Sequence, residues 1–570
     1  MKSLLSCLLI ISLAYSNYSH SQVNKEKIAK VLNDYFHLDR ENIHVHLDKS
    51  IFLTNEQIWF KGYVFHRKLN MPFFATTNVY ANLIDSEGKI IDTQLLYGSM
   101  ASFSGAFKLN ENFRSGKYYL QFYTNWMNNF LEDESAVYEV EIINPVQGAA
   151  SALGRPALSH IDIKLHPEGG ILLQETSNSI GVSVTDCNNN AVPVSSVDIV
   201  TPGGEIIKTI QINKLGYGRF DLAANSPAGL KVVATINGSK HEQALPALQI
   251  KGVSLEVNNY AVADKLIVKV KTNKVTNTSY EGKPFYMVVQ QDEKVLISEF
   301  SFKDGKLEQT IILPQNDLFS GTNTIRILDA DLNQIAERLV FKYPKENLTA
   351  TIKQTKHSGD ITAVTATVGR PLMNLSVSIL PENSISAQAD NDIFGSLLLA
   401  PYLENSKDTK GRYYFETLSR VKQYELDLFL LSQNSKYKWR DIINTPPKSN
   451  HKFEMGLALK ASINNSTGKK KDTKVRIYSF ENIIDEQADI NDKGEIYLDN
   501  LILTDSTKVE FSLMEKGEKK LVKLYPQIFN NNRKFIKPFK PVIRECPLPA
   551  DNNAAALALP GFSEGTIVLK

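Results

Sequence analysis

Short segments in which apolar and polar residues alternate dominate the first part of the chain. Around Phe60, the side chains of Ile58 and Phe60 would share one face of an extended strand, and Trp59 and Lys61 would share the other. Turns that contain glycine, such as the one at Gly88, separate these segments. Alternation with a period of two, interrupted by glycine turns, is typical of half-buried antiparallel strands, so this region predicts a β-sandwich.

The same pattern recurs along the chain and predicts an all-β fold of tandem β-sandwiches, with a short N-terminal helix and one helical insertion. The blocks resemble one another in length, although no exact internal repeat is present. The expected organisation is a signal peptide at 1–21, a helix with a first β-sandwich at 22–145, a second β-sandwich at 160–247, a third at 250–345, a β domain with a helical segment at 346–445, a smaller β-sandwich at 450–526 and an extended C-terminal arm at 527–570.

Two stretches depart from the strand pattern and have helical spacing. The first predicts a short amphipathic helix near the N-terminus, which we expect to cap the first sandwich. Its apolar positions are Ile28, Val31, Leu32 and Phe36. The second, at 417–435, predicts a helix with one broad apolar face. The residues of that face are Leu418, Val421, Leu428 and Leu431.

The N-terminal residues have the layout of a secretory signal. After Lys2, residues 4–14 form an apolar run that is shorter than the about 20 residues needed to span a bilayer, but that suits a signal peptide. Small residues at Ser19 and Ser21 predict cleavage before Gln22. We therefore expect an exported protein that has no transmembrane segment after signal cleavage.

Cysteine usage adds little to the fold prediction. Cys7 lies inside the apolar run, so we expect it to leave with the signal peptide rather than to carry a lipid. Cys187 and Cys546 remain, in a compartment that permits disulfides. Two cysteines so far apart in sequence do not establish a bond, so we expect no disulfide scaffold, and the pairing of Cys187 with Cys546 stays open.

Charge excludes one class of partner. The chain holds 64 basic and 62 acidic residues, which gives a formal net charge of +2, and 42% of its residues are hydrophobic. A balance of this kind offers no electrostatic attraction for nucleic acid or for an anionic membrane surface. The apolar content is sufficient for several packed cores, so we expect folded domains rather than a disordered chain.

Several short motifs narrow the fold. In the first block they are His46-Leu47-Asp48-Lys49-Ser50, the strand at 56–64, Ser104-Gly105-Ala106-Phe107 and the strand at 115–127; in the second they are Pro167-Glu168-Gly169-Gly170 and Gly216-Tyr217-Gly218-Arg219-Phe220. In these motifs the chain resembles a family of Bacteroidetes cell-envelope proteins, which are built from macroglobulin-type domains related to those of α2-macroglobulin. The resemblance implies macroglobulin-like or Ig-like sandwiches. The glycine pair has its own explanation, since turn positions with positive φ favour glycine.

Many members of that family continue with a carboxypeptidase regulatory-like domain and a TonB-receptor plug-like domain. Residues 489–506 resemble the first of these, and the sequence ends where a plug would begin, so we expect the plug to be missing. The family also has a stretch similar to 397–439. There, its usual Gly-Trp-Arg is replaced by Asn434, Ser435 and Lys436, so the role of that motif in relatives is not carried over.

The sequence offers no recognised catalytic motif on which to build an active site. Covalent trapping by an α2-macroglobulin needs a Cys-Gly-Glu-Gln thioester, whereas Cys187 precedes three asparagines and Cys546 precedes Pro547. No His-Glu-x-x-His zinc helix and no Gly-x-x-x-x-Gly-Lys phosphate loop occurs. We therefore expect no enzymatic activity and no cofactor, assign no catalytic, cofactor-binding or metal-binding residue, and leave the binding residues unknown.

Two motifs imitate metal sites. His44 and His46 would point to one face of a strand beside Asp48, and two imidazoles at this spacing can bind a metal. Because no third ligand can be placed, we favour a solvated strand edge.

Residues 489–494 imitate the start of a calcium loop, but a lysine stands at its fifth position and Asn500 at its twelfth. A calcium loop needs a bidentate glutamate at the twelfth position, so we predict a tight turn.

The C-terminal arm carries a basic run with interleaved aromatic residues. It consists of Arg533, Lys534, Phe535, Lys537, Phe539, Lys540 and Arg544. One interpretation is a contact to acidic lipid or to a partner protein. We favour a solvated arm, because runs of charge usually face water.

Taken together, these features predict a non-catalytic, exported scaffold or accessory protein of the periplasm or outer membrane, with the cell surface as a further location. Its partner would be a protein, which the family resemblance implies to be an outer-membrane β-barrel or a TonB-dependent transporter. One alternative is a surface adhesin or a non-covalent protease-binding protein, with 381–412 as a candidate bait segment. Another is an enzyme with an unrecognised site.

Overall fold

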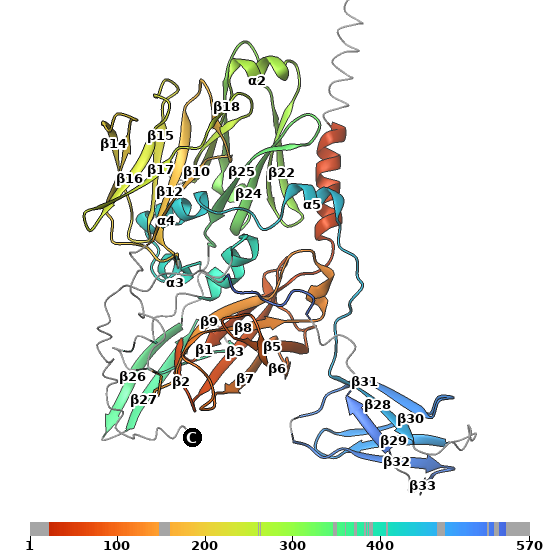
Figure 1. Ribbon diagram of the computed structural model, residues 1–570. Coiled ribbons are helices and arrows are strands. Elements are labelled where there is room, and N and C mark those ends of the chain that lie inside the picture. The colour runs from red at the N-terminus through yellow and green to blue at the C-terminus, as the bar shows by residue number, and fades with distance from the viewer. Residues whose placement is uncertain are drawn as a thin grey trace, which may run out of the picture.

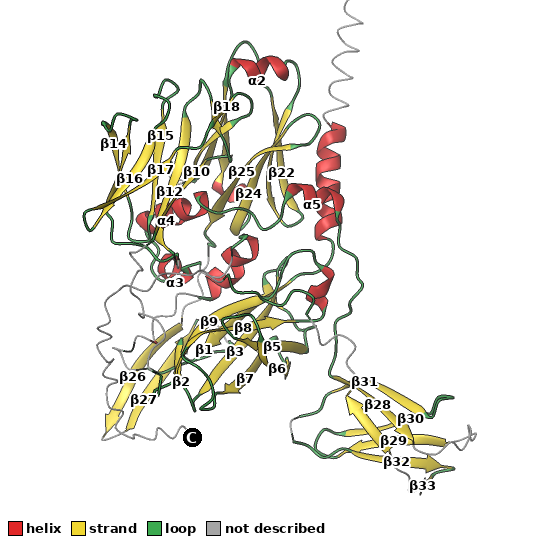
Figure 2. Cartoon of the chain, viewed as in Figure 1, coloured by secondary structure: helices red, strands yellow, loops and turns green. Residues whose placement is uncertain are grey.

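The computed structural model is built mainly of strands, with few and short helices (Figure 2). It describes residues 22–147, 160–345, 350–380 and 392–542, with short gaps inside the last three ranges, together with residues 384 and 386. The predicted signal peptide at 1–21 lies outside the described residues, and so do residues 381–383, 385, 387–391 and 406–408 of the candidate bait segment. The predicted fold class is confirmed, since the chain forms successive two-sheet β-sandwiches.

The first β-sandwich consists of two facing sheets. In the four-stranded sheet, β3 (Gln57–His66) pairs with β1 (Glu41–Leu47), β4 (Met71–Pro72) and β7 (Ser102–Lys108). The five-stranded sheet has the order β2 (Ile51–Leu53), β9 (Ala136–Ile143), β8 (Gly116–Tyr123), β5 (Asn78–Ile84) and β6 (Ile90–Tyr97).

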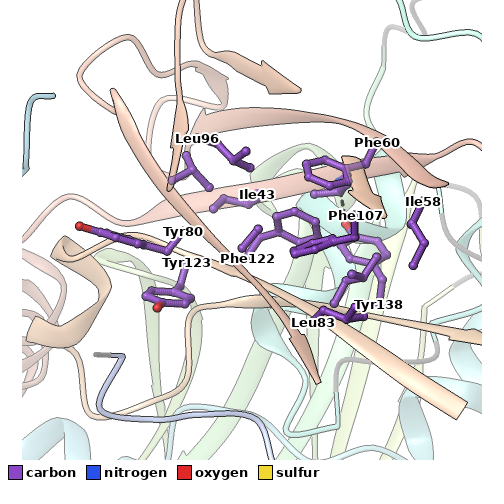
Figure 3. Packing of buried hydrophobic residues seen from close by; sticks show 14 of the residues in the cluster. Ile43, Ile58, Phe60, Tyr80, Leu83, Leu96, Phe107, Phe122, Tyr123 and Tyr138 are labelled. Atoms are coloured by element: carbon purple, nitrogen blue, oxygen red, sulfur yellow. Dashed lines mark hydrogen bonds between the residues drawn. The ribbon is translucent and has the colours of Figure 1, made fainter. Parts of the chain in front are cut away.

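Aromatic residues from both sheets fill the core of this sandwich (Figure 3). The ring centroids of Phe60, on β3, and Phe122, on β8, lie 5.1 Å apart. Ile58 and Phe60 are buried, whereas 57% of Trp59 is exposed, as the alternation predicts. Burying side chains of this size is the main source of stability in such a domain.

The second and third sandwiches repeat the two-sheet arrangement. The second has the sheet β10 (Ile161–Pro167), β12 (Asn178–Asp186), β15 (Tyr217–Leu222) and the sheet β14 (Ile206–Gln211), β13 (Ser196–Val200), β16 (Lys231–Ile236), β17 (Ser239–Ala244), with β11 (Leu172–Leu173) pairing β18 (Leu248–Gln249). The third has β19 (Ser254–Asn258), β20 (Lys265–Lys271), β23 (Glu308–Pro314) facing β22 (Lys294–Phe300), β21 (Phe285–Gln291), β24 (Gly321–Leu328), β25 (Gln334–Lys342), and the helix α2 (Lys274–Ser279).

A hairpin and a group of helices follow the third sandwich. The hairpin is β26 (Ala350–Ser358) with β27 (Ile361–Val368). The helical insertion, residues 392–444, contains η4 (Gly395–Leu399), η5 (Ala400–Tyr402), α3 (Gly411–Phe415), α4 (Arg420–Leu431) and α5 (Trp439–Asn444). α3 and α4 lie between the first sandwich and the other two, whereas α5 lies beside the N-terminal helix (Figure 1), and α4 packs on β25 and β15.

The apolar face of α4 differs from the predicted one. Leu428 and Leu431 are buried, but 47% of Leu418 and 66% of Val421 are exposed. Leu418 precedes the helix, whose N-cap is Ser419, and Val421 lies in its first turn. The spacing predicted the helix correctly but assigned its first turn to the wrong environment.

The N-terminal helix, residues 22–36, packs on the third sandwich rather than capping the first, which corrects the prediction. Ile28 and Leu32 share a core cluster with Tyr286 and Val288 of β21 and with Trp439 of α5. The face of the third sandwich formed by β21 is apolar, and the helix packs on it. The sequence pattern of the helix shows only that one of its faces is buried.

The last β-sandwich stands apart from the rest of the molecule (Figure 1). Its sheets are β31 (Glu495–Leu501), β28 (Leu457–Ile463), β34 (Leu524–Ile528) and β30 (Ile484–Asp489), β29 (Thr473–Ser479), β32 (Glu510–Glu515), β33 (Glu518–Lys520). The predicted tight turn is present: Asn491 accepts hydrogen bonds from the backbone of Lys493 and Glu495, and Gly494 has φ of 72°.

The arm beyond this sandwich, described at 535–542, is anchored to the first sandwich by two buried aromatic side chains rather than fully solvated. Phe535 and Phe539 are buried against the first sandwich, so this part of the prediction is wrong. Arg533, Lys534 and Arg544 lie outside the described residues. Within the described ranges, no helix has the length and apolar character that a membrane crossing requires.

Candidate interaction site

Glu134, in the loop before β9, is the centre of a buried cluster of charges. Arg67 donates to Glu134 Oε2 at 2.5 Å, Arg40 donates to Oε1 at 3.1 Å, and Tyr437 Oη donates to Oε1 at 2.7 Å. The Nζ of Lys436 lies 3.6 Å from Oε2. Burial alone would raise the pKa of Glu134, but Arg67, Lys436 and Arg40 hold it well below its ordinary value, so the side chain is ionised.

The third sandwich joins this cluster through Asp292, in the turn after β21. Arg67 Nη1 lies 3.9 Å from Asp292 Oδ1, and Tyr402 Oη donates to Oδ2 at 2.9 Å. We call Arg40, Arg67, Glu134, Asp292 and Tyr437 the first charged junction. It connects the first sandwich, the segment after the N-terminal helix, the third sandwich and the helical insertion.

A second charged junction, formed by Glu168, Arg219, Arg338 and Asp427, holds the second and third sandwiches to α4. Arg338 Nε donates to Glu168 Oε1 at 3.0 Å, and Arg219 Nη2 lies 3.0 Å from Oε2. Arg338 Nη2 also lies 2.9 Å from Asp427 Oδ2. Two acidic and two basic groups meet, so the charges of the junction balance, which lowers the cost of burying them.

The local sequence explains how Glu168 reaches this position. Gly169 and Gly170 follow it with φ of 93° and 102°, so the predicted turn with positive φ is confirmed. The backbone NH of Glu168 donates to Ser179 O in β12 at 2.8 Å, and its carbonyl accepts from Leu255 N in β19 at 3.2 Å. The turn is therefore the seam between the second and third sandwiches, and its glutamate faces into that seam.

Asn434, Ser435 and Lys436 contribute contacts between domains. Ser435 N donates to Glu337 Oε1 in β25 at 3.1 Å, and Lys436 Nζ donates to Asp133 O at 2.6 Å. Asn434 donates to Glu404 at 3.0 Å within the insertion. This segment ties the insertion to the third and first sandwiches at once.

His44 on β1 is buried and His46 is half-buried, so the predicted solvated strand edge is wrong at His44. His44 Nδ1 lies 2.9 Å from Ser396 Oγ, and His46 Nδ1 lies 2.7 Å from Ser376 Oγ. Burial lowers the pKa of His44 to about 3 and also lowers that of His46, so both imidazoles are neutral at pH 7. Within the described part of the chain, no group of three His, Cys, Asp or Glu side chains is placed to hold a metal, Asp48 included.

A cleft of about 2350 Å³ opens between the first sandwich, the second sandwich and the helical insertion. His46, His166 and Phe429 line it, together with Cys187 and Val542. Its charged lining residues are four lysines and four acidic residues, so the cleft favours neither anions nor cations.

Cys187 forms a disulfide whose partner lies outside the described residues, a bond that the sequence could not establish.

The first sandwich also binds the linker that leads into the last sandwich, through ring stacking and hydrogen bonds. Phe453 stacks on Trp126 with ring centroids 4.3 Å apart. Asn78 makes two hydrogen bonds to the backbone of Gly456, at 2.7 and 2.8 Å, and Tyr80 Oη donates to Glu454 at 2.6 Å. These contacts fix the point from which the last sandwich projects.

The sequence predicts no binding residues, and the structure brings together groups that no sequence pattern connects. Glu168 and Arg219 lie in motifs that carry the family resemblance, but nothing in the sequence indicates that they meet each other or Arg338. The expectation that the sequence holds no catalytic motif needs one correction, since a Gly-x-Ser-x-Gly match, the pattern of a hydrolase nucleophile elbow, occurs at 561–565, outside the described residues.

Comparisons with known proteins concern the fold. No known family profile and no curated protein matches the chain. It is similar to Salmonella α2-macroglobulin reacted with methylamine, at 10% identity over 58% of this chain and 25% of that one, with a TM-score of 0.15. It is also similar to Escherichia coli α2-macroglobulin activated by porcine elastase, at 9% identity over 86% of this chain and 43% of that one, with a TM-score of 0.20. A third similar structure is a tetra-tandem repeat of a large adhesion protein, at 9% identity over 86% of this chain and 100% of that one, with a TM-score of 0.15.

This chain spans only about a quarter of the length of the first macroglobulins that it matches. At these identities and TM-scores the likeness is one of macroglobulin-like and Ig-like β-sandwich architecture. It carries no argument about activity, partner or source.

Proposed function

We propose that this protein is a non-catalytic, exported scaffold or accessory protein of the cell envelope, acting at the periplasm or outer membrane with a TonB-dependent transporter or another outer-membrane β-barrel. The sequence supports this through its signal-peptide pattern and its resemblance to macroglobulin-like envelope proteins of Bacteroidetes. One structural observation carries the proposal further.

That observation is the second charged junction. Glu168 and Arg219 belong to motifs that carry the resemblance, Asp427 lies in the stretch similar to the family's helical segment, and all three are used to hold sandwiches together. A catalytic acid or base must reach a substrate, whereas these buried groups face one another. Their role is therefore structural, as a scaffold requires.

The geometry of the linker supports a role for the last sandwich in partner binding. The two charged junctions hold three sandwiches and the helical insertion in one arrangement, and Asn78 fixes where the chain leaves it at Gly456. The last sandwich projects from this body (Figure 1) and offers its free faces to a partner. We infer that the projecting sandwich contributes to partner binding.

A native pull-down of the tagged full-length protein from solubilised envelopes, followed by mass spectrometry, tests the proposal. Stoichiometric recovery of an outer-membrane β-barrel or a TonB-dependent transporter is the expected result. The variant Asn78→Ala/Phe453→Ala, which loosens the linker, should recover less partner, whereas Asn112→Ala, at an exposed position of the same sandwich, should behave as wild type. Recovery of the protein alone would overturn the proposal, and protease binding and adhesion would be tested next.

A further inference from the structure

The outer face of β8 carries a row of side chains that holds a peptide. Leu120 and Phe122 point into the core of the first sandwich, so the alternating residues Tyr119, Gln121 and Tyr123 point outward. All three are nonetheless buried, because residues 535–542 lie across them. We call these three side chains the β8 row.

The side chains of the β8 row contact both the aromatic rings and the backbone of residues 535–542. Phe535 stacks on Tyr123 with centroids 4.6 Å apart, and Phe539 packs on Tyr119 at 4.8 Å. Between them, Gln121 donates to Lys537 O at 3.1 Å and accepts from Phe539 N at 3.0 Å. The side-chain amide of Gln121 thus pairs with one backbone carbonyl and one backbone NH of the segment, as a neighbouring strand would. The rings of Tyr123 and Tyr119 favour an aromatic residue at each end of the segment.

Two further groups set the register. Asn128 Oδ1 accepts from Ile536 N at 3.0 Å, and Lys537 donates to the carbonyl of Phe130. The acidic residues 132–134 lie close enough to act on the charge of Lys537. By contrast, 59% of Ile536 and 74% of Val542 are exposed, so these positions carry little of the recognition.

This contact differs in kind from the charged junctions. It is made by one short segment that adds no strand to the sheet and bends at 536–537, and it buries two rings and part of Lys537 rather than a network of arginines and carboxylates. A contact of this size resembles a bound peptide, which can leave without unfolding the domains that it connects.

We propose that the β8 row is a peptide-docking site, that residues 535–542 occupy it as a latch, and that its other occupant is an extended segment of a partner protein with two aromatic residues four positions apart and a basic residue midway. Release of the latch removes the contact that residues 535–542 make with the first sandwich, in addition to which the last sandwich is held by its entry linker. Binding of the partner segment is thereby coupled to the freedom of that sandwich. The inference does not depend on which envelope protein the partner is.

A labelled synthetic peptide of residues 533–544 is the probe, and the full-length protein is the receptor, with a reductant present so that no disulfide restrains the arm. Wild type, whose row is occupied, should bind the peptide weakly. Phe535→Ala/Phe539→Ala should bind it at least tenfold more tightly by fluorescence anisotropy. Ile536→Ala/Val542→Ala, altered in the same segment at exposed positions, should match wild type.

Adding Gln121→Leu to the Phe535→Ala/Phe539→Ala variant should abolish the gain, and so should replacing both phenylalanines in the peptide. A gain that survives either change, or no gain in a variant whose circular dichroism is native, would overturn the proposal. If the variant does not fold, hydrogen exchange on wild type decides instead. Excess peptide should speed exchange of the Phe539 amide while β8 stays protected, and unchanged exchange would overturn the proposal.

Discussion

Glu168 and Arg338 form a buried ion pair across 170 positions of the chain, with 3.0 Å between Oε1 and Nε. Their side chains are 0% and 2% exposed. The pair joins the turn after β10 in the second sandwich to β25 in the third, and Arg338 continues to Asp427 on α4. Removing one member of such a group leaves opposite charges buried without compensation, so this seam depends on every member.

Glu168→Ala should therefore destabilise the protein strongly, because Arg219 and Arg338 would lose their carboxylate. We expect a loss of about 3–5 kcal/mol in the free energy of unfolding, measured by urea denaturation. Glu242→Ala is the matched control, since it breaks an exposed pair with Lys231 and should cost about 0.2–1 kcal/mol. Equal effects of the two substitutions would show that the buried seam is not a source of stability.

Stability should also respond to pH through Glu41, a fully buried carboxyl group whose contacts are the hydroxyls of Thr76 and Thr124. Burial raises the pKa of Glu41 from its ordinary 4.5 to about 7. Between these two pH values the folded state binds more protons than the unfolded state, so stability falls as pH rises. The expected total is about 3 kcal/mol.

Glu41→Gln isolates this contribution, because it removes the titrating group and keeps the shape. Its free energy of unfolding relative to wild type should increase from pH 4.5 to pH 7.5. Buried His44, with its pKa lowered to about 3, changes stability in the opposite direction at low pH, but it does so in both proteins and cancels. A difference that stays constant with pH would contradict the assignment.

Cys187 should be found bonded to Cys546 in the exported protein. Cys187 is in a disulfide, and the other cysteines of the sequence are Cys7, within the predicted signal peptide, and Cys546. Val542, four residues before Cys546, lines the same cleft as Cys187. Peptide mapping without reduction identifies the pair; a bond to Cys7, or a free Cys546, would contradict this prediction.

The fold was accessible from the sequence because strand alternation is a local property. Ile58 and Phe60 face inward and Trp59 outward because neighbouring side chains point to opposite sides of a strand, whatever lies beyond them. The turn at Gly169 was predicted for the same reason, since positive φ is decided by the residue itself.

The arrangement of the domains was not accessible, because it depends on contacts between residues that are distant in the chain. The spacing of Ile28 and Leu32 shows that one helix face is buried, but it cannot tell the first sandwich from the third. Phe535 and Phe539 looked like part of a solvated basic arm, because their partners Tyr123 and Tyr119 lie more than 400 positions away. Glu168 likewise carries no local sign of its two arginines.

The central claim is that the charged junctions hold three sandwiches and the helical insertion in one cooperative body. Scanning calorimetry of the full-length protein tests it most directly, since a single cooperative unit has equal calorimetric and van't Hoff enthalpies. The account predicts one transition for this body, shifted to lower temperature as a whole by Glu134→Ala or Glu168→Ala, and at most one further transition for the last sandwich. Separate transitions for the individual sandwiches, each insensitive to these substitutions, would contradict it.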